Sequence, residues 1–350
     1  MQSTASESTD SGPIIRGQGR PVAVICGGSA GVGRSTVREF AGHGYDVAVF
    51  ARGQAGVDAA VADAESSGVQ AMGLTVDASD LAALHSAADQ VEATLGEIDV
   101  WVNVSFVGAL RYFWDTDPEV YRRITDVSYF GQVNGTRVAL ARMRLRDHGV
   151  IVQVGSALAF RGIPLQSAYC GAKHAVKGFT ESVITELKHE RSCVRVAMVQ
   201  LPGMNTPQFD WNDNAFDEHP MPVPPIFEPE VAAQAIRYVA EHRRRNIWVG
   251  VPTAYTILGN RLAPSFLDWY LARTGVKGQL TQSDAPRRGS NVFAAKDAHT
   301  DAGARGAFTN RSHRVDPWSW ISMRRAPLGA AGAAGVVGIA AIAWWRSSLR

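Results

Sequence analysis

The chain has 350 residues, of which 46% are hydrophobic and 19% are charged, and its formal net charge is +2. This composition is ordinary for a globular protein with a large buried core, and so small a net charge does not indicate nucleic-acid binding. The one dense basic run, residues 242–245, is better explained as a solvated helix end, with nucleic-acid binding as the alternative. The three cysteines are too few for a disulfide framework and form no metal-ligand spacing with the histidines, so we expect a reducing, cytoplasmic compartment and no metal site.

Residues 1–19 are rich in Ser and Thr and lack an apolar run, so we expect a disordered N-terminus. From residue 20 to 250, short apolar runs alternate with longer amphipathic stretches. Continuous apolar strands separated by helices indicate an α/β fold of the Rossmann type, a doubly wound parallel sheet covered on both faces. The expected strands are 21–26, 46–51, 69–76, 98–104, 149–154, 194–200 and 247–249, and the expected helices include 32–43, 81–95, 168–190 and 230–242.

A glycine-rich turn joins the first expected strand to the first expected helix. Glycines allow the backbone to approach a pyrophosphate, and the helix N-terminus supplies amide donors and partial positive charge. A glycine cluster is a weak signal by itself, but this position in a βαβ unit predicts dinucleotide binding, with a plain turn as the alternative. The predicted cofactor residues of this turn are Gly27, Ser29, Gly31, Val32 and Gly33.

The end of the second strand predicts which dinucleotide is used. An acid at this place bonds the ribose 2′-hydroxyl of NAD, whereas an Arg accommodates the 2′-phosphate of NADP. The strand ends in Ala51-Arg52-Gly53 without an acid. We therefore predict that Arg52, assisted by Arg34, binds a 2′-phosphate and that the cofactor is NADP(H). The alternative is that Arg52 is a solvated surface residue.

Ser156, Tyr169 and Lys173 are the candidate catalytic residues. Tyr169 and Lys173 are four residues apart in a helical stretch, so they share one face. An ammonium near a phenol lowers the pKa of the phenol, which suits Tyr169 to exchange a proton with a carbonyl oxygen. Ser156 follows the fifth strand at its carboxyl end, where its hydroxyl is placed to hold the substrate oxygen. Such a Tyr/Lys pair is usually only a helix surface, and its place downstream of a dinucleotide site is what favours catalysis.

Residues 20–250 resemble the classical short-chain dehydrogenase/reductase family. The resemblance rests on motifs that follow the strands in order: Gly27-x-x-x-Gly31-x-Gly33, Asp77, Asn103, Ser156, Tyr169-Cys-Gly-Ala-Lys173 and Pro202-Gly203-Met-Asn-Thr206. It implies hydride transfer between a nicotinamide ring and a carbonyl or alcohol.

The resemblance also implies roles for the matched residues. Lys173 would bond the nicotinamide ribose, Asp77 the adenine, and Asn103 would support the central strands. Pro202, Gly203 and Thr206 would lie along the nicotinamide. Asp77 and Thr206 have the alternative of plain turn or capping residues.

Three positions depart from the family pattern. Cys26 replaces a Thr before the first glycine, and the usual Asn-Asn-Ala-Gly run is Asn103-Val104-Ser105-Phe106. Ser128 stands where the family has a catalytic Asn that holds a water between Lys173 and solvent. A Ser hydroxyl still has one donor and two acceptor sites, so we expect Ser128 to act in the same proton relay. The alternative is that Ser128 only bonds the backbone of its own helix.

The last hundred residues extend beyond the family pattern. We expect a helical extension at 251–282, with apolar spacing over 253–274, and a flexible polar linker at 283–325. Residues 326–345 carry no charge and have Arg and Trp at both ends, which predicts a transmembrane helix. An interfacial or partner helix and a disordered tail are the alternatives.

We therefore predict an NADP(H)-dependent oxidoreductase with a small-molecule carbonyl or alcohol substrate. An apolar lid at 204–225 and the expected anchor favour a lipophilic substrate. We also expect a homo-oligomer with its catalytic domain in the cytoplasm. The alternatives are a protein that senses NADP(H) without turnover and a membrane-tethered scaffold.

Overall fold

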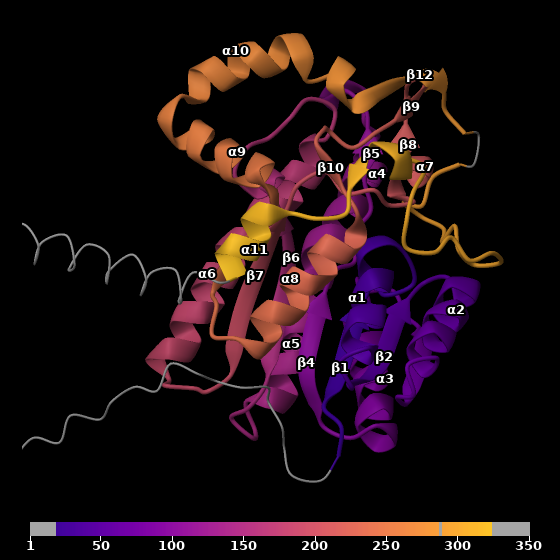
Figure 1. The fold of residues 1–350 in the computed structure, drawn as a ribbon, viewed down its shortest axis with the longest axis vertical. Helices are drawn as coiled ribbons and strands as arrows, with labels where there is room; N and C mark the ends of the chain where they lie inside the picture. The colour runs from indigo at the N-terminus through magenta and orange to yellow at the C-terminus, as the bar shows by residue number, and fades with distance from the viewer. Residues whose placement is uncertain (1–18, 287–288, 324–350) are drawn as a thin grey trace, which may run out of the picture.

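The computed structural model describes residues 19–286 and 289–323, and its centre is a parallel sheet (Figure 1). The strand order is β11-β7-β6-β4-β1-β2-β3, and all strands are parallel. Successive strands are added on one side of β1 up to β3 and on its other side from β4 onward, and open α/β sheets bind ligands at this point between β1 and β4. The expected doubly wound fold is confirmed. The strands are β1 Val22–Cys26, β2 Asp46–Ala51, β3 Ala71–Thr75, β4 Ile98–Asn103, β6 Val150–Ser156, β7 Arg195–Leu201 and β11 Asn246–Trp248.

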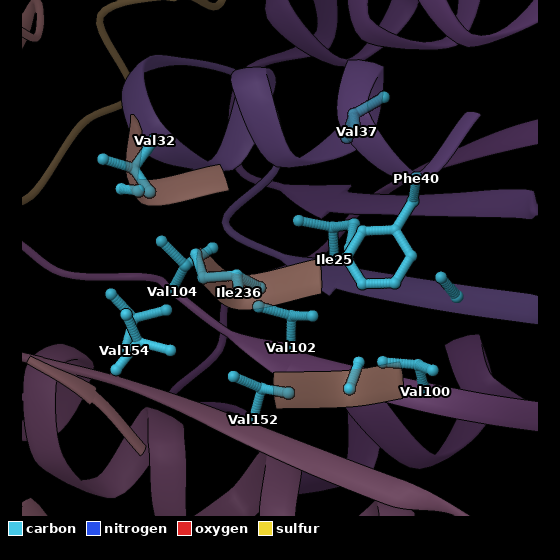
Figure 2. Packing of buried hydrophobic residues seen from close by; sticks show 14 of the residues in the cluster. Ile25, Val32, Val37, Phe40, Val100, Val102, Val104, Val152, Val154 and Ile236 are labelled. Carbon is cyan, nitrogen blue, oxygen red and sulfur yellow. The ribbon is translucent and has the colours of Figure 1, made fainter. Parts of the chain in front are cut away.

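Helices cover both faces of this sheet because its central strands are buried throughout and largely apolar. One face packs against α1 (Gly31–Ala41), α2 (Gln54–Glu65) and α8 (Pro229–Glu241). Figure 2 shows Val37 and Phe40 of α1 and Ile236 of α8 over the valines of β4 and β6. The other face packs against α3 (Leu81–Thr94), α5 (Gly131–Met143) and α6 (Ser167–His189).

Shorter elements gather at the carboxyl ends of the strands. α4 (Pro118–Thr125) continues through a π-helical turn, Asp126–Phe130, into α5. α7 (Gln208–Trp211) lies in the predicted lid. Three two-stranded pairs lie here too: β5 (Ala109–Leu110) with β8 (Asp213–Asn214), β9 (Glu218–Pro220) with β12 (Leu280–Asp284), and β10 (Ile226–Phe227) with β13 (Ser312–His313).

The extension after β11 is helical, as expected, but it is divided. α9 (Gly250–Leu262) ends at Ala263, and Pro264 begins α10 (Pro264–Thr274). Proline has no amide hydrogen to donate and clashes with a preceding turn, so a continuous helix is interrupted there.

The sequence predicts a flexible linker over 283–325, but residues 289–316 pack against the sheet domain. The helix α11 (Pro317–Met323) follows them. Val292 and Phe308 are buried, and backbone hydrogen bonds join this segment to the sheet domain at Gly31, Ala55 and Gly56. We call residues 289–306 the strap (orange, right of α1 in Figure 1). The strap has no periodicity because it is a series of turns and bends anchored by polar contacts, which composition alone does not distinguish from a linker.

Within the described residues, no helix is both long and apolar enough to cross a bilayer. The predicted transmembrane helix at 326–345 lies outside them.

Candidate active site

A cleft with roughly 800 Å³ of empty space opens above β1, β2 and β4. The predicted glycine-rich turn lines it, since Gly27, Ser29, Gly31, Val32 and Gly33 all face this space. A Cβ on Gly33 would stand 1.9 Å from the carbonyl oxygen of Gly27, and Gly27 itself has a φ of +104°. Only glycine allows the helix to approach the strand this closely, as a dinucleotide cradle requires.

Asp77 lies at the far end of the same cleft, after β3. Its carboxylate accepts hydrogen bonds from the Ser79 amide at 2.9 Å and the Ser79 hydroxyl at 2.7 Å, and it pairs with Arg123. Burial opposes its ionisation, but Arg123 and Ser79 hold its pKa below the usual value. Arg123 comes from α4 and carries no sequence signal that links it to Asp77.

Arg52 and Arg34, predicted to bind a phosphate, are both occupied by protein atoms. Arg52 donates to the carbonyl oxygens of Asn291 at 2.5 Å and Val292 at 3.2 Å, both in the strap. Arg34 is buried and donates to Asp63 and Asp301 and to the carbonyl oxygens of Ser29, Gly56 and Ala59. Arg52 lines the cleft, whereas Arg34 fastens the glycine turn to α2 and to the strap.

Ser156, Tyr169 and Lys173 meet beside the cleft. The Ser156 hydroxyl hydrogen-bonds Tyr169 and lowers its pKa, whereas burial raises the pKa of Tyr169 by more. Burial lowers the pKa of Lys173 to about 7. Its Nζ donates to the carbonyl oxygen of Val154 at 2.7 Å and lies 5.6 Å from the centre of the Tyr169 ring. The Tyr169 phenol therefore lies between a hydroxyl that favours its ionised form and an amine that gains or loses a proton near neutrality.

Asn103 lies in a buried polar network below this site. It accepts from the Trp101 indole at 2.8 Å and donates to Gln153 at 3.0 Å and Thr136 at 3.2 Å. These bonds tie β4 to β6 and to α5, so Asn103 supports the strands and does not line the cleft.

The Pro202-to-Thr206 turn lies on the other side of the cleft. Thr206 lines it, and a Cβ on Gly31 would stand 3.2 Å from the Thr206 side chain. Pro202 and Gly203 do not line the cleft, and a Cβ on Gly203 would meet the carbonyl oxygen of Val223 at 2.6 Å.

A family model described as short chain dehydrogenase matches residues 21–215. The chain belongs to this family. An uncharacterized oxidoreductase of Bacillus subtilis is 29% identical over 296 residues, covering 83% of each chain. A dehydrogenase/reductase SDR family member 7B of Xenopus tropicalis is 26% identical, covering 75% of this chain and 88% of the relative.

Solved structures of short-chain dehydrogenases share the fold. One from Burkholderia phymatum, in complex with NAD, has a TM-score of 0.62 at 20% identity and covers 72% of this chain and 95% of its own. An alcohol dehydrogenase of Thermococcus sibiricus, complexed with 5-hydroxy-NADP, has a TM-score of 0.58 at 20% identity and covers 66% of this chain and 96% of its own.

This short-chain dehydrogenase differs from the family pattern at Ser128 and Phe106. Ser128 is buried in the π-helical turn, where its hydroxyl accepts from the Val107 amide at 3.2 Å and donates to the Val107 carbonyl at 3.0 Å. These two bonds use its only donor and one acceptor site. The part of Ser128 in a proton relay stays a prediction.

Phe106 fills space near Tyr169 and Lys173 that a glycine would leave open. Its ring lines the cleft, lies 5.6 Å from the Tyr169 ring, and has the Lys173 amine 5.8 Å from its centre. Phe106 therefore makes the wall around Tyr169 apolar.

Proposed function

We propose that this protein is a nicotinamide-dependent oxidoreductase that interconverts a carbonyl compound and the corresponding alcohol. The observation that carries the proposal is the Ser156–Tyr169–Lys173 group beside a glycine cradle that excludes any side chain at Gly33. When bound, a nicotinamide dinucleotide supplies or accepts the hydride. Residues 27–33 and Thr206 would hold it, and Asp77 would lie near its adenine end.

The catalytic side chains supply the proton and the polarity. Ser156 would donate a hydrogen bond to the substrate oxygen, while the Tyr169 hydroxyl transfers its proton to the same oxygen during reduction. A protonated Lys173 favours the phenolate that remains. Because the pKa of Lys173 is about 7, its charge changes near neutral pH.

The sequence predicts NADP(H) dependence from Arg52, and the proposed function itself does not choose between the two nucleotides. The support for NADP(H) is the place of Arg52 in the cleft and the absence of an acid at the end of β2. Against it, both Arg52 and Arg34 already donate to protein acceptors. Binding of a 2′-phosphate by Arg52 would require it to leave the strap carbonyls.

A lipophilic substrate is supported by the apolar wall that Phe106 builds beside Tyr169. Membrane anchoring through 326–345 and a homo-oligomer with a cytoplasmic catalytic domain rest on the sequence alone. Fractionation without detergent and sedimentation of the full chain test them.

The deciding experiment is a screen of the full chain with NADH and with NADPH against aldehydes, ketosteroids and fatty ketones, with Tyr169→Phe as the matched control. We expect carbonyl-dependent oxidation of the nucleotide that the control lacks. Nucleotide binding without turnover of any carbonyl favours the sensor alternative, and failure to bind either nucleotide favours the scaffold.

A further inference from the structure

The strap places a carboxylate in the dinucleotide cleft, at the end of β2 where the sequence has no acid. The Asp297 carbonyl accepts from the Gly56 amide at 3.0 Å, and the neighbouring Ala298 carbonyl accepts from Ala55 at 3.3 Å. These bonds fix Asp297 against the first turn of α2. Asp297 lines the cleft together with Ser29 of the glycine-rich turn.

Two glycines make room for this side chain. A Cβ on Gly53 would stand 1.9 Å from Asp297 Oδ1, and a Cβ on Gly56 would stand 2.3 Å from Oδ2. Any larger residue at either position would displace the carboxylate. The partial positive charge at the N-terminus of α2 favours an anion at this place.

One oxygen of the Asp297 carboxylate, Oδ2, lacks a hydrogen-bond donor among the described residues. Asp297 is only 5% exposed, and no group in the described part of the chain donates to its Oδ2. Leaving a buried acceptor unpaired costs free energy, so a ligand that donates to it there gains affinity. The cleft residues around it belong to a dinucleotide cradle, and the hydroxyls of a ribose are donors of the required kind.

The charges nearby favour a ribose hydroxyl over a phosphate. A 2′-phosphate would meet the negative charge of Asp297 at close range, while Arg52 and Arg34 are held by strap and α2 acceptors. Two cations oppose this preference: Lys296 also lines the cleft, and the Arg52 guanidinium interacts electrostatically with Asp297.

We propose that Asp297, carried by the strap, takes the place of the missing acid at the end of β2 and accepts a hydrogen bond from the adenosine ribose, so that NAD(H) is preferred to NADP(H). This inference rests on the proposed oxidoreductase function only in assuming a nicotinamide dinucleotide in the cleft. It makes the strap a part of the cofactor site.

The test measures binding without any carbonyl substrate. NADH and NADPH are titrated into the full chain, and energy transfer from tryptophan to the nicotinamide is recorded, since Trp211 lines the cleft. We expect NADH to bind at least tenfold more tightly than NADPH. Asp297→Asn should weaken NADH binding by about ten- to a hundredfold, because a hydrogen bond to a charged group is replaced by a weaker one. The ratio of the NADPH Kd to the NADH Kd should therefore fall.

Asp58→Asn is the matched control, because Asp58 lies on α2, accepts a hydrogen bond from Gln54 at 2.7 Å and does not line the cleft. It should leave the NADH/NADPH ratio unchanged. Thermal unfolding of each variant checks that the strap stays in place, and the ratio for the unmodified chain tests the inference independently of any variant.

Tighter binding of NADPH by the unmodified chain overturns the inference, as does an equal loss of both nucleotides in Asp297→Asn. If NADPH is preferred and carbonyls are reduced, the inference fails and the proposed function stands. If NADH is preferred and no carbonyl is reduced, the proposed function fails and the inference stands. Binding of neither nucleotide overturns both.

Discussion

Burial of the Lys173 amine destabilises its charged form in the folded protein. The free energy of unfolding therefore depends on pH in a direction that can be predicted. Only 2% of the surface of Lys173 is exposed, and burial lowers its pKa from 10.5 to about 7. At about 1.36 kcal/mol for each pKa unit, the charged form is destabilised in the folded protein by roughly 5 kcal/mol.

The sign follows from proton linkage. Between pH 7 and pH 10.5 the unfolded chain binds a proton at this lysine that the folded protein has released, so stability from this group rises with pH. The destabilisation of the folded protein by the charged Lys173 is greatest below about pH 7 and disappears as the pH approaches 10.5. Lys173→Met removes the titrating group. The Val154 carbonyl keeps the hydrogen bond from Gln132, at 3.3 Å, after the substitution.

We expect Lys173→Met to be more stable than the unmodified protein near pH 7, by an amount that falls by about 2 kcal/mol between pH 7 and pH 9. Urea unfolding followed by circular dichroism at both pH values measures this difference. Lys177→Met is the control, because Lys177 lies on the same helix, is partly exposed and pairs with Glu181 at 2.9 Å. Parallel pH dependences of Lys173→Met and the unmodified protein would refute a buried, titrating Lys173.

Three further substitutions test the site. Tyr169→Phe should lower kcat by about 10²–10⁴-fold and leave the nucleotide Kd unchanged, so undiminished turnover in steady-state assays contradicts its role as proton donor. Arg52→Ala should lower the free energy of unfolding, because Arg52 donates hydrogen bonds to two strap carbonyls. It should change the Kd of NADH and of NADPH by the same factor, and a loss of affinity confined to NADPH in titrations would support the phosphate-binding role. Ser128→Ala should cost about 1–3 kcal/mol of stability in urea unfolding, because two buried Val107 groups lose a partner, and an unchanged kcat and pH profile would end the relay hypothesis.

Much of the fold and the meeting of Ser156, Tyr169 and Lys173 could be predicted from the sequence, because both depend on local patterns. Apolar runs such as Val22–Cys26 and Ile98–Asn103 are strands because a fully covered parallel sheet requires continuous apolar residues. Tyr169 and Lys173 share a helix face because they are four residues apart, and Gly33 is required by the closeness of strand and helix in this motif.

The arrangement of the cleft next to β2 depends on the tertiary structure and could not be predicted from the sequence. Arg52 at the end of β2 predicts a phosphate ligand only if its guanidinium is free, and its acceptors in the strap lie about 240 residues further along the chain. Asp297 lies in a polar segment without periodicity, and nothing local distinguishes such a segment from a linker. Hydrogen bonds between distant backbone groups hold it in the cleft, and these depend on the assembled fold rather than on neighbouring residues.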